Sequence, residues 1–253
     1  MPEERDERAG RILDAAAALI VRLGYGKTTI DDIARRAGIA KGTVYLHWKS
    51  RDALFVALLR RERVLLLTDA RDRLAAEAGG RTPRALIRAL AAALTRRPLL
   101  RAVLVRDLDV IGKLAHDQHG GAPTRSGAGR GSGGEDRAAV EALRGYLDEL
   151  RRAGAVRDDL EADALLTIVG STFTGFFFTP WLRGDMARPD EEMAGLLAET
   201  IDRALAPARG APAPTAAVAE ATTRFLDAAL DLAERKLAAV LTPPARAGKS
   251  TSR

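Results

Sequence analysis

Apolar residues recur every three or four positions along most of the chain, which is the spacing of α-helices. The first series predicts a helix from Arg8 to Leu23, and Gly24 ends it because glycine tolerates the backbone of a helix terminus. The apolar positions of this helix are Ile12, Leu13, Ala16, Leu19, Ile20 and Leu23. Residues 1–8 precede the series, and we expect them to be frayed. The pattern predicts an all-α protein.

A short helix with clear end signals comes next. Thr29 is suited to cap its N-terminus, with Asp32 three positions later in the arrangement of a capping box. Ile30 and Ile33 fall on one side of the helix, and Gly38 ends it. The segment therefore predicts a helix of about two and a half turns that buries one face.

A second short helix begins near Lys41 after a tight turn. Val44 and Trp48 lie four residues apart on its buried face, and Ser50 caps the following helix with Asp52 in the first turn. This succession predicts a helix-turn-helix. The exposed polar groups of its second helix are Lys41, Thr43, Tyr45 and His47.

The rest of the chain has the same helical spacing, interrupted by glycine- and proline-containing stretches. Helices are predicted over residues 50–78, 83–94, 98–115, 135–153, 159–183, 189–205 and 215–241. We expect Pro180 to bend or end the helix that contains it. Residues 118–134 are rich in Gly and Ser and almost free of apolar residues, which predicts a mobile loop.

These boundaries suggest a small N-terminal domain and a larger one, for which 253 residues are sufficient. The predicted divisions are a helix-turn-helix domain at 1–50, a larger helical domain at 51–206, a stiff linker at 207–214, an extra C-terminal helix at 215–241 and a disordered tail at 242–253.

Charge agrees with a nucleic-acid partner. The chain has a formal net charge of +6 and a pI near 10.0. Between Arg22 and Arg51 there are seven basic residues against two acidic ones, which is the local excess that contact with phosphates requires. Capped helices with exposed lysines also occur in ordinary helical proteins, so the charge adds to the helix-turn-helix pattern and does not replace it.

Residues from about 10 to 57 resemble the N-terminal DNA-binding domain of the TetR (tetracycline-repressor) family. The residues that carry the resemblance form a dense run: Ile12, Leu13, Ala16, Ala17, Gly24, Tyr25, Thr28, Thr29, Ile30, Ile33, Ala34, Ala37, Gly38, Lys41, Gly42, Thr43, Val44, Tyr45, Trp48, Lys49, Ser50, Arg51, Asp52 and Leu54. The chain departs from the usual family residues at His47, Trp48 and Arg51, each of which keeps the chemical role of the residue that it replaces.

The resemblance implies a ligand-responsive transcriptional regulator that binds double-stranded DNA as a homodimer. We expect a repressor that a ligand releases from a near-palindromic operator, with activation as the alternative, since the direction depends on where the operator lies. The residues expected to bind DNA are Thr28, Thr29, Thr43, His47, Lys49 and Arg51 for the phosphates and Lys41, Gly42 and Tyr45 for base edges.

Two apolar sets outside this domain are candidates for ligand binding and dimerisation. The expected pocket wall is Leu100, Val103, Leu104, Leu108, Ile111, Phe173 and Phe177, which would favour a hydrophobic small molecule. The expected dimer interface is Leu166, Phe176, Trp181, Leu197 and Ile201, on the two helices that the family uses for this purpose. Packing in the core is the simpler interpretation of the same aromatic residues.

Other classes of protein find less support. There is no cysteine, no signal peptide and no uninterrupted run of about 18 apolar residues, so we expect a bacterial cytoplasmic protein that acts at the nucleoid, without a membrane span. No catalytic set or cofactor motif appears, so we predict no enzyme and no cofactor. His116 and His119, with Asp107 or Asp109, could share a metal, but solvated histidines are commoner. A helical adaptor whose C-terminal helix binds a protein partner is the remaining alternative.

Overall fold

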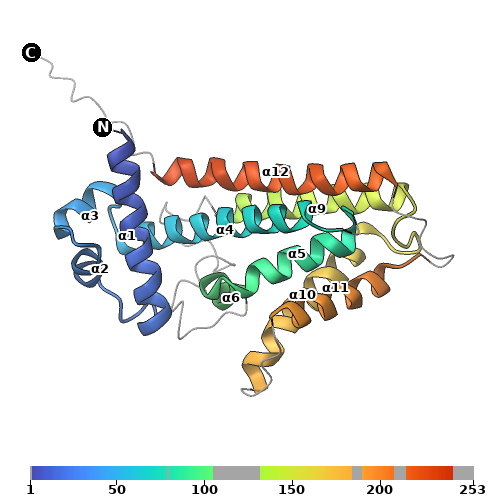
Figure 1. Ribbon diagram of the computed structural model, residues 1–253, viewed down its shortest axis with the longest axis horizontal. Coiled ribbons are helices and arrows are strands. Elements are labelled where there is room, and N and C mark those ends of the chain that lie inside the picture. The colour runs from blue at the N-terminus through green and yellow to red at the C-terminus, as the bar shows by residue number, and fades with distance from the viewer. Residues whose placement is uncertain (1, 79, 105–131, 184–189, 208–214, 242–253) are drawn as a thin grey trace, which may run out of the picture.

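Helices form all the regular structure in the part of the chain that the computed structural model describes, namely residues 2–78, 80–104, 132–183, 190–207 and 215–241 (Figure 1). The helices are α1 (Pro2–Leu23), α2 (Ile30–Ala37), α3 (Lys41–His47), α4 (Arg51–Ala75), α5 (Pro83–Thr95), α6 (Pro98–Leu104), α9 (Ser132–Arg152), α10 (Ala162–Arg183), α11 (Asp190–Leu205) and α12 (Ala216–Leu241). The prediction of an all-α fold is confirmed.

Several helix boundaries differ from those predicted, and a predicted effect of Pro180 is absent. α1 begins at Pro2 and not at Arg8, because proline suits the first turn of a helix and Glu4 pairs with Arg8 one turn later at 2.8 Å. α9 begins at Ser132, so the last three residues of the predicted loop are helical, while 118–131 lie outside the described residues. α10 continues through Pro180 to Arg183, so this proline does not end the helix.

The N-terminal helices surround a core of their own. Ile12 and Ile20 of α1, Ile33 of α2 and Val44 of α3 meet there, and each is at most 1% exposed. The core does not stop at residue 50, because Phe55 and neighbouring residues of α4, with two residues of α6, belong to it. The N-terminal helices α1, α2 and α3 are therefore packed against the first turns of α4.

A second core holds the rest of the molecule together. α11 packs on α5, α12 packs on α4 and α9, and α10 contacts both α9 and α11. Between α9 and α12 the rings of Tyr146 and Phe225 stack with centroids 4.8 Å apart, and the Tyr146 hydroxyl lies 2.9 Å from Thr222 Oγ1. The C-terminal helix is thus part of this core and not an appended segment.

α12 also links the two cores. It runs along the length of α4 (Figure 1), and Val240 and Leu241 at its end pack against the N-terminal core. Near that end, Arg60 of α4 donates a hydrogen bond to the Lys236 carbonyl at 3.0 Å. The sequence did not reveal this arrangement.

The apolar residues predicted for the pocket and the dimer interface lie in different environments. Leu197 and Ile201 are fully buried within the core of this chain, so neither is available on the surface for a second subunit. Phe177 is buried, whereas the remaining described candidates are partly buried: Leu100, Val103, Leu104, Leu166, Phe173 and Phe176. Leu108, Ile111 and the side chain of Trp181 lie outside the described residues.

Among the described helices, α10 is long and apolar enough over Ala162–Thr179 to cross a membrane, judged by length and composition alone. It packs against α9 and α11, and Leu165 is completely buried there. Over the whole stretch, 17% of the residues are buried within the chain.

Candidate nucleic-acid interface

α2 is fixed at both ends by its own sequence. The Thr29 hydroxyl accepts a hydrogen bond from the Asp32 backbone N–H at 3.1 Å, and the Asp32 carboxylate accepts one from the Thr29 N–H at 3.2 Å. The Thr29 hydroxyl also lies 2.6 Å from the Asp32 carboxylate and donates to it, and this bond, together with the one from the Thr29 N–H, lowers the pKa of Asp32. At the other end Gly38 has φ 68°, a left-handed conformation that glycine adopts without strain, and its N–H caps the helix. The capping box predicted from the sequence is confirmed.

α3 is held by one face only. Val44 is completely buried, Trp48 directly after the helix is 3% exposed, and the Trp48 N–H donates to the Val44 carbonyl at 2.9 Å. The other side of this short helix is exposed at Lys41, Gly42, Tyr45 and Leu46. Two apolar contacts thus anchor α3 against the N-terminal core and leave its outer face to solvent.

Side-chain contacts join the start of α4 to the turn before α2. The Arg51 guanidinium lies over the Tyr25 ring, 4.2 Å from its centroid, and Nη1 donates to the Thr28 carbonyl at 3.2 Å. The Tyr25 hydroxyl donates to the Asp52 carboxylate. Burial and this hydrogen bond raise the pKa of Tyr25 to about 12. The contacts hold the turn, α2 and α4 in one unit.

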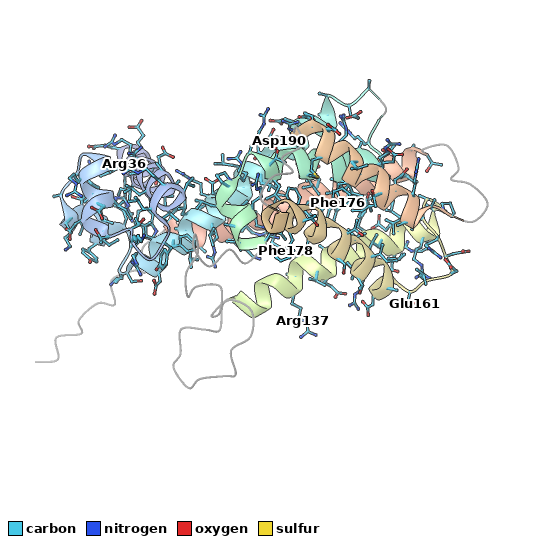
Figure 2. The ribbon with its side chains drawn as sticks, turned by 90° about the horizontal axis from the view of Figure 1, so that it is seen from below. Arg36, Arg137, Glu161, Phe176, Phe178 and Asp190 are labelled. Atoms are coloured by element: carbon cyan, nitrogen blue, oxygen red, sulfur yellow. The ribbon has the colours of Figure 1, made fainter. Side chains whose placement is uncertain are left out.

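Two exposed ion pairs lie on the surface around α2 and α3. Lys41 Nζ is 2.8 Å from Asp31 Oδ2, which raises the pKa of Lys41, and Arg35 pairs with Asp32. Such pairs contribute little in water, so the cations can exchange a carboxylate for a phosphate at small cost. Figure 2 places Arg36, on α2, at the end of the molecule opposite Glu161. Arg36 is exposed there, on the same helix as Arg35.

The predicted DNA-binding residues divide into three groups. Thr29, Lys41, Gly42, Tyr45 and Lys49 are exposed. Thr43, His47 and Arg51 are half-buried, and burial lowers the pKa of His47, with Arg5 and Arg8 adding to the shift.

Thr28 is the exception. It is 1% exposed, and its hydroxyl donates to the Gly24 carbonyl at 2.9 Å, so its side chain points inward and supports the turn. A threonine that satisfies its own backbone is not available to a phosphate, and we withdraw it from the candidate contacts.

One exposed residue of the outer face was not on the sequence-based list. Leu46 is 77% exposed, although its neighbours Tyr45 and His47 were both selected. Polar and charged side chains are the ones expected to contact DNA, so the sequence pattern did not single out an apolar residue. Its position two residues after Val44, on the opposite side of a helix, was the available signal.

The residues of the candidate metal site, His116, His119 and the aspartates near them, lie outside the described residues. Within the ranges that are described, no three His, Asp or Glu side chains come together to hold a metal ion.

Comparison with known proteins decides the class of this arrangement. Residues 12–58, which run from α1 into α4, match the sequence model of the N-terminal domain described as bacterial regulatory proteins, tetR family. The match covers 47 of the 253 residues, so the similarity to the TetR family lies in the N-terminal part of the chain. The matched segment contains the capped α2, the exposed face of α3 and the start of α4.

Curated TetR-family relatives match the N-terminal part of the chain. It is 40% identical to the HTH-type transcriptional activator FasR of Mycolicibacterium smegmatis over 70 residues, which are 28% of this chain and 32% of FasR. It is 36% identical to the HTH-type transcriptional repressor KstR of the same species over 123 residues, 45% of this chain and 59% of KstR. The chain thus spans less than two thirds of the length of these relatives.

Solved structures resemble a larger share of the chain. FadR from Bacillus subtilis, in complex with stearoyl-CoA, has a TM-score of 0.52 and 18% identity and covers 76% of this chain and 96% of its own. The fatty acid degradation regulator FadR from Bacillus halodurans has a TM-score of 0.54 and 16% identity, with 78% and 98% covered. At these identities the likeness establishes the fold.

Proposed function

We propose that this protein is a ligand-responsive DNA-binding regulator of the TetR family, a repressor that binds a near-palindromic operator as a homodimer in the bacterial cytoplasm. The observation that carries the proposal is the presentation of α3, which Val44 and Trp48 anchor from one side while its outer face lies open among cations. A helix displayed in this way fits the major groove of duplex DNA.

The exposed side chains of the N-terminal unit would divide the contacts. Lys41, Gly42 and Tyr45 would reach base edges, because they lie on the outer face of α3. Thr29 and Lys49, with the half-buried Thr43, His47 and Arg51, would position the protein on phosphates. Phosphate contacts fix register, whereas sequence preference comes from the face of α3.

A homodimer would use the apolar surface of α10 and α11. Leu166 and Phe176 of α10 are partly buried, Phe178 is 37% exposed, and Leu196 of α11 is 42% exposed. Figure 2 shows Phe176 and Phe178 projecting from α10. With Leu197 and Ile201 buried in the core, these residues replace them in the proposed interface.

The effector would be a hydrophobic small molecule held between α6 and α10, which contact one another. Leu100, Val103 and Leu104 would form one wall, and Phe173 and Phe177, whose ring centroids are 5.3 Å apart, the other. Leu108 and Ile111 stay in this prediction from sequence. The stearoyl-CoA in the B. subtilis FadR structure supports an effector with an apolar chain. The effector can shift the equilibrium between two arrangements of the N-terminal domains in the dimer only as far as its affinities for these arrangements differ.

The adaptor alternative is less favoured. Its premise was a C-terminal helix able to bind a partner protein, but Leu226, Leu230 and Ala233 of α12 are buried in the core of this chain. A helix that already covers α4 and α9 has no second apolar face to offer.

Selection of bound sites from random duplex DNA with the purified full chain tests the proposal. We expect a near-palindromic consensus, and we expect Tyr45→Ala to weaken binding to it by about 1–3 kcal/mol without lowering the melting temperature. Glu161→Ala is the control, since Glu161 is an exposed residue at the far end of the molecule (Figure 2). Absence of any enriched sequence would overturn the proposal.

A further inference from the structure

The fold makes no use of the Leu46 side chain. It is 77% exposed, the highest value among the exposed large hydrophobic residues of the described chain, although it lies within α3. α3 is anchored through Val44 and Trp48, so the stability of the helix does not explain a leucine at this position. Scattered apolar residues are common on protein surfaces, but this one lies on the surface that faces DNA in the proposed function.

The position of Leu46 on the helix directs it outward. Successive residues turn by about 100°, so Leu46 lies about 200° from the buried Val44 and on the same face as Gly42, four residues earlier. A leucine side chain on a helix leans over the turn before it, which here is the turn of Gly42. A Cβ built on Gly42 would meet nothing within 4 Å. Leu46 therefore borders an open space beside the backbone of Gly42.

Cations lie near the residue after Leu46. Arg5 and Arg8 are close enough to His47 to lower its pKa, with Asp6 acting in the opposite direction, and Lys41 is exposed at the start of the same helix. An apolar side chain among cations fits a polyanion that presents an apolar group. In the major groove of DNA that group is the C5-methyl of thymine, which apolar side chains contact.

We propose that Leu46 is a specificity-determining residue that reads a thymine C5-methyl group in each half-site of the operator. This inference rests on the proposed function and adds a defined base preference to it. The leucine and the methyl group exclude water from one another, while the open space beside Gly42 lets the base edge approach the helix.

Deoxyuridine provides the test, because it pairs like thymine and lacks only the methyl group. In the selected operator each thymine of a half-site is replaced in turn by deoxyuridine, symmetrically in both halves, and the affinity of the full chain is measured. We expect one position at which the replacement weakens binding by about fourfold per half-site, or about sixteenfold for the pair, the factor expected for one buried carbon group.

Two variants assign the effect to the side chain. Leu46→Ala should bind the thymine and deoxyuridine operators at that position with equal affinity, and its thermal unfolding should match that of the wild type. Leu65→Ala is the matched control, a leucine of α4 that is 39% exposed, and it should keep the full difference between the two operators.

The outcomes separate this inference from the proposed function. A palindromic consensus without a thymine position sensitive to deoxyuridine, or a Leu46→Ala protein that keeps the wild-type sensitivity, would overturn the role of Leu46 and leave the proposed function standing. A selection that enriches no sequence would overturn both.

Discussion

At the scale of single residues, Arg51 has a structural role that its family resemblance did not indicate. The resemblance suggests a phosphate-binding cation, yet the guanidinium stacks on Tyr25 and donates to the Thr28 carbonyl. Lys49, two residues earlier, is exposed. The two cations therefore differ in their contacts within the chain, and sequence alone could not separate them because the partners of Arg51 lie more than 20 positions away.

Substitution separates the two cations. Arg51→Ala should lower the free energy of unfolding by about 1–3 kcal/mol, because it removes a charged hydrogen-bond donor and a stacked cation. Lys49→Ala should leave unfolding unchanged and reduce the slope of log affinity for DNA against log salt by about one. Urea unfolding and salt titrations of DNA binding measure these effects. Equal stability of Arg51→Ala and wild type would refute the structural role.

The buried tyrosines predict how stability depends on alkaline pH. The pKa of Tyr25 rises to about 12 and that of Tyr146 rises further through burial, so both phenols stay neutral in the folded protein after they would ionise in the unfolded chain. Their contribution is therefore complete below about pH 10 and declines as the pH rises above that value.

The substitution Tyr146→Phe tests the direction of this pH dependence of stability. At neutral pH it should cost about 1 kcal/mol, because the hydroxyl that meets Thr222 in the core is lost. Above pH 10 the difference between wild type and variant should shrink, since phenylalanine has no proton to lose in the unfolded state. Urea midpoints at pH 7 and at pH 11 provide the comparison. A difference that grows with pH would contradict the account.

At the scale of elements, a buried carboxylate joins three helices. Glu62 of α4 is 9% exposed and lies 3.8 Å from Arg61 and 3.6 Å from Arg97, at the start of α6. Arg61 in turn pairs with Asp14 of α1 at 2.8 Å and donates to the Gly10 carbonyl. These ion pairs connect α1 of the N-terminal core, through α4, to the start of α6, which forms part of the proposed ligand site.

Removing the central carboxylate should be costly. Glu62→Ala leaves two poorly hydrated guanidinium groups without their shared anion, and we expect the free energy of unfolding to fall by about 3 kcal/mol. Asp14→Ala removes an exposed partner of the same network and should cost less than about 1 kcal/mol. Chemical denaturation of the two variants measures the contrast, and similar losses in both would argue against a central role for Glu62.

Elements with local signals could be predicted from the sequence, while their packing could not. Thr29, Asp32, Gly38 and Ser50 act within three or four residues of their own positions, and the helices that they define appear where expected. The direction of a side chain such as Thr28 depends on the fold of the turn. The burial of Leu197 depends on α5, a helix about a hundred positions away, which helical spacing alone does not reveal.

At the scale of the whole molecule, α4 belongs to both cores and α12 lies along it. Leu54 and Leu58 of α4 are part of the N-terminal core, whereas Leu67 and Leu74 are part of the larger one. A ligand that moved the larger core would therefore also move the N-terminal core, because α4 belongs to both cores. The division at residue 50 stays a prediction, and the packing places the joint within α4.

The most direct test of the central claim is the affinity of the purified protein for the selected operator with five base pairs inserted between its half-sites. Five base pairs turn one half-site by about half a helical turn to the other face of the duplex. Two copies of α3 held on one side of a dimer could then engage only one half-site, so affinity should fall to that of a single half-site. Binding that is indifferent to this insertion would contradict the account.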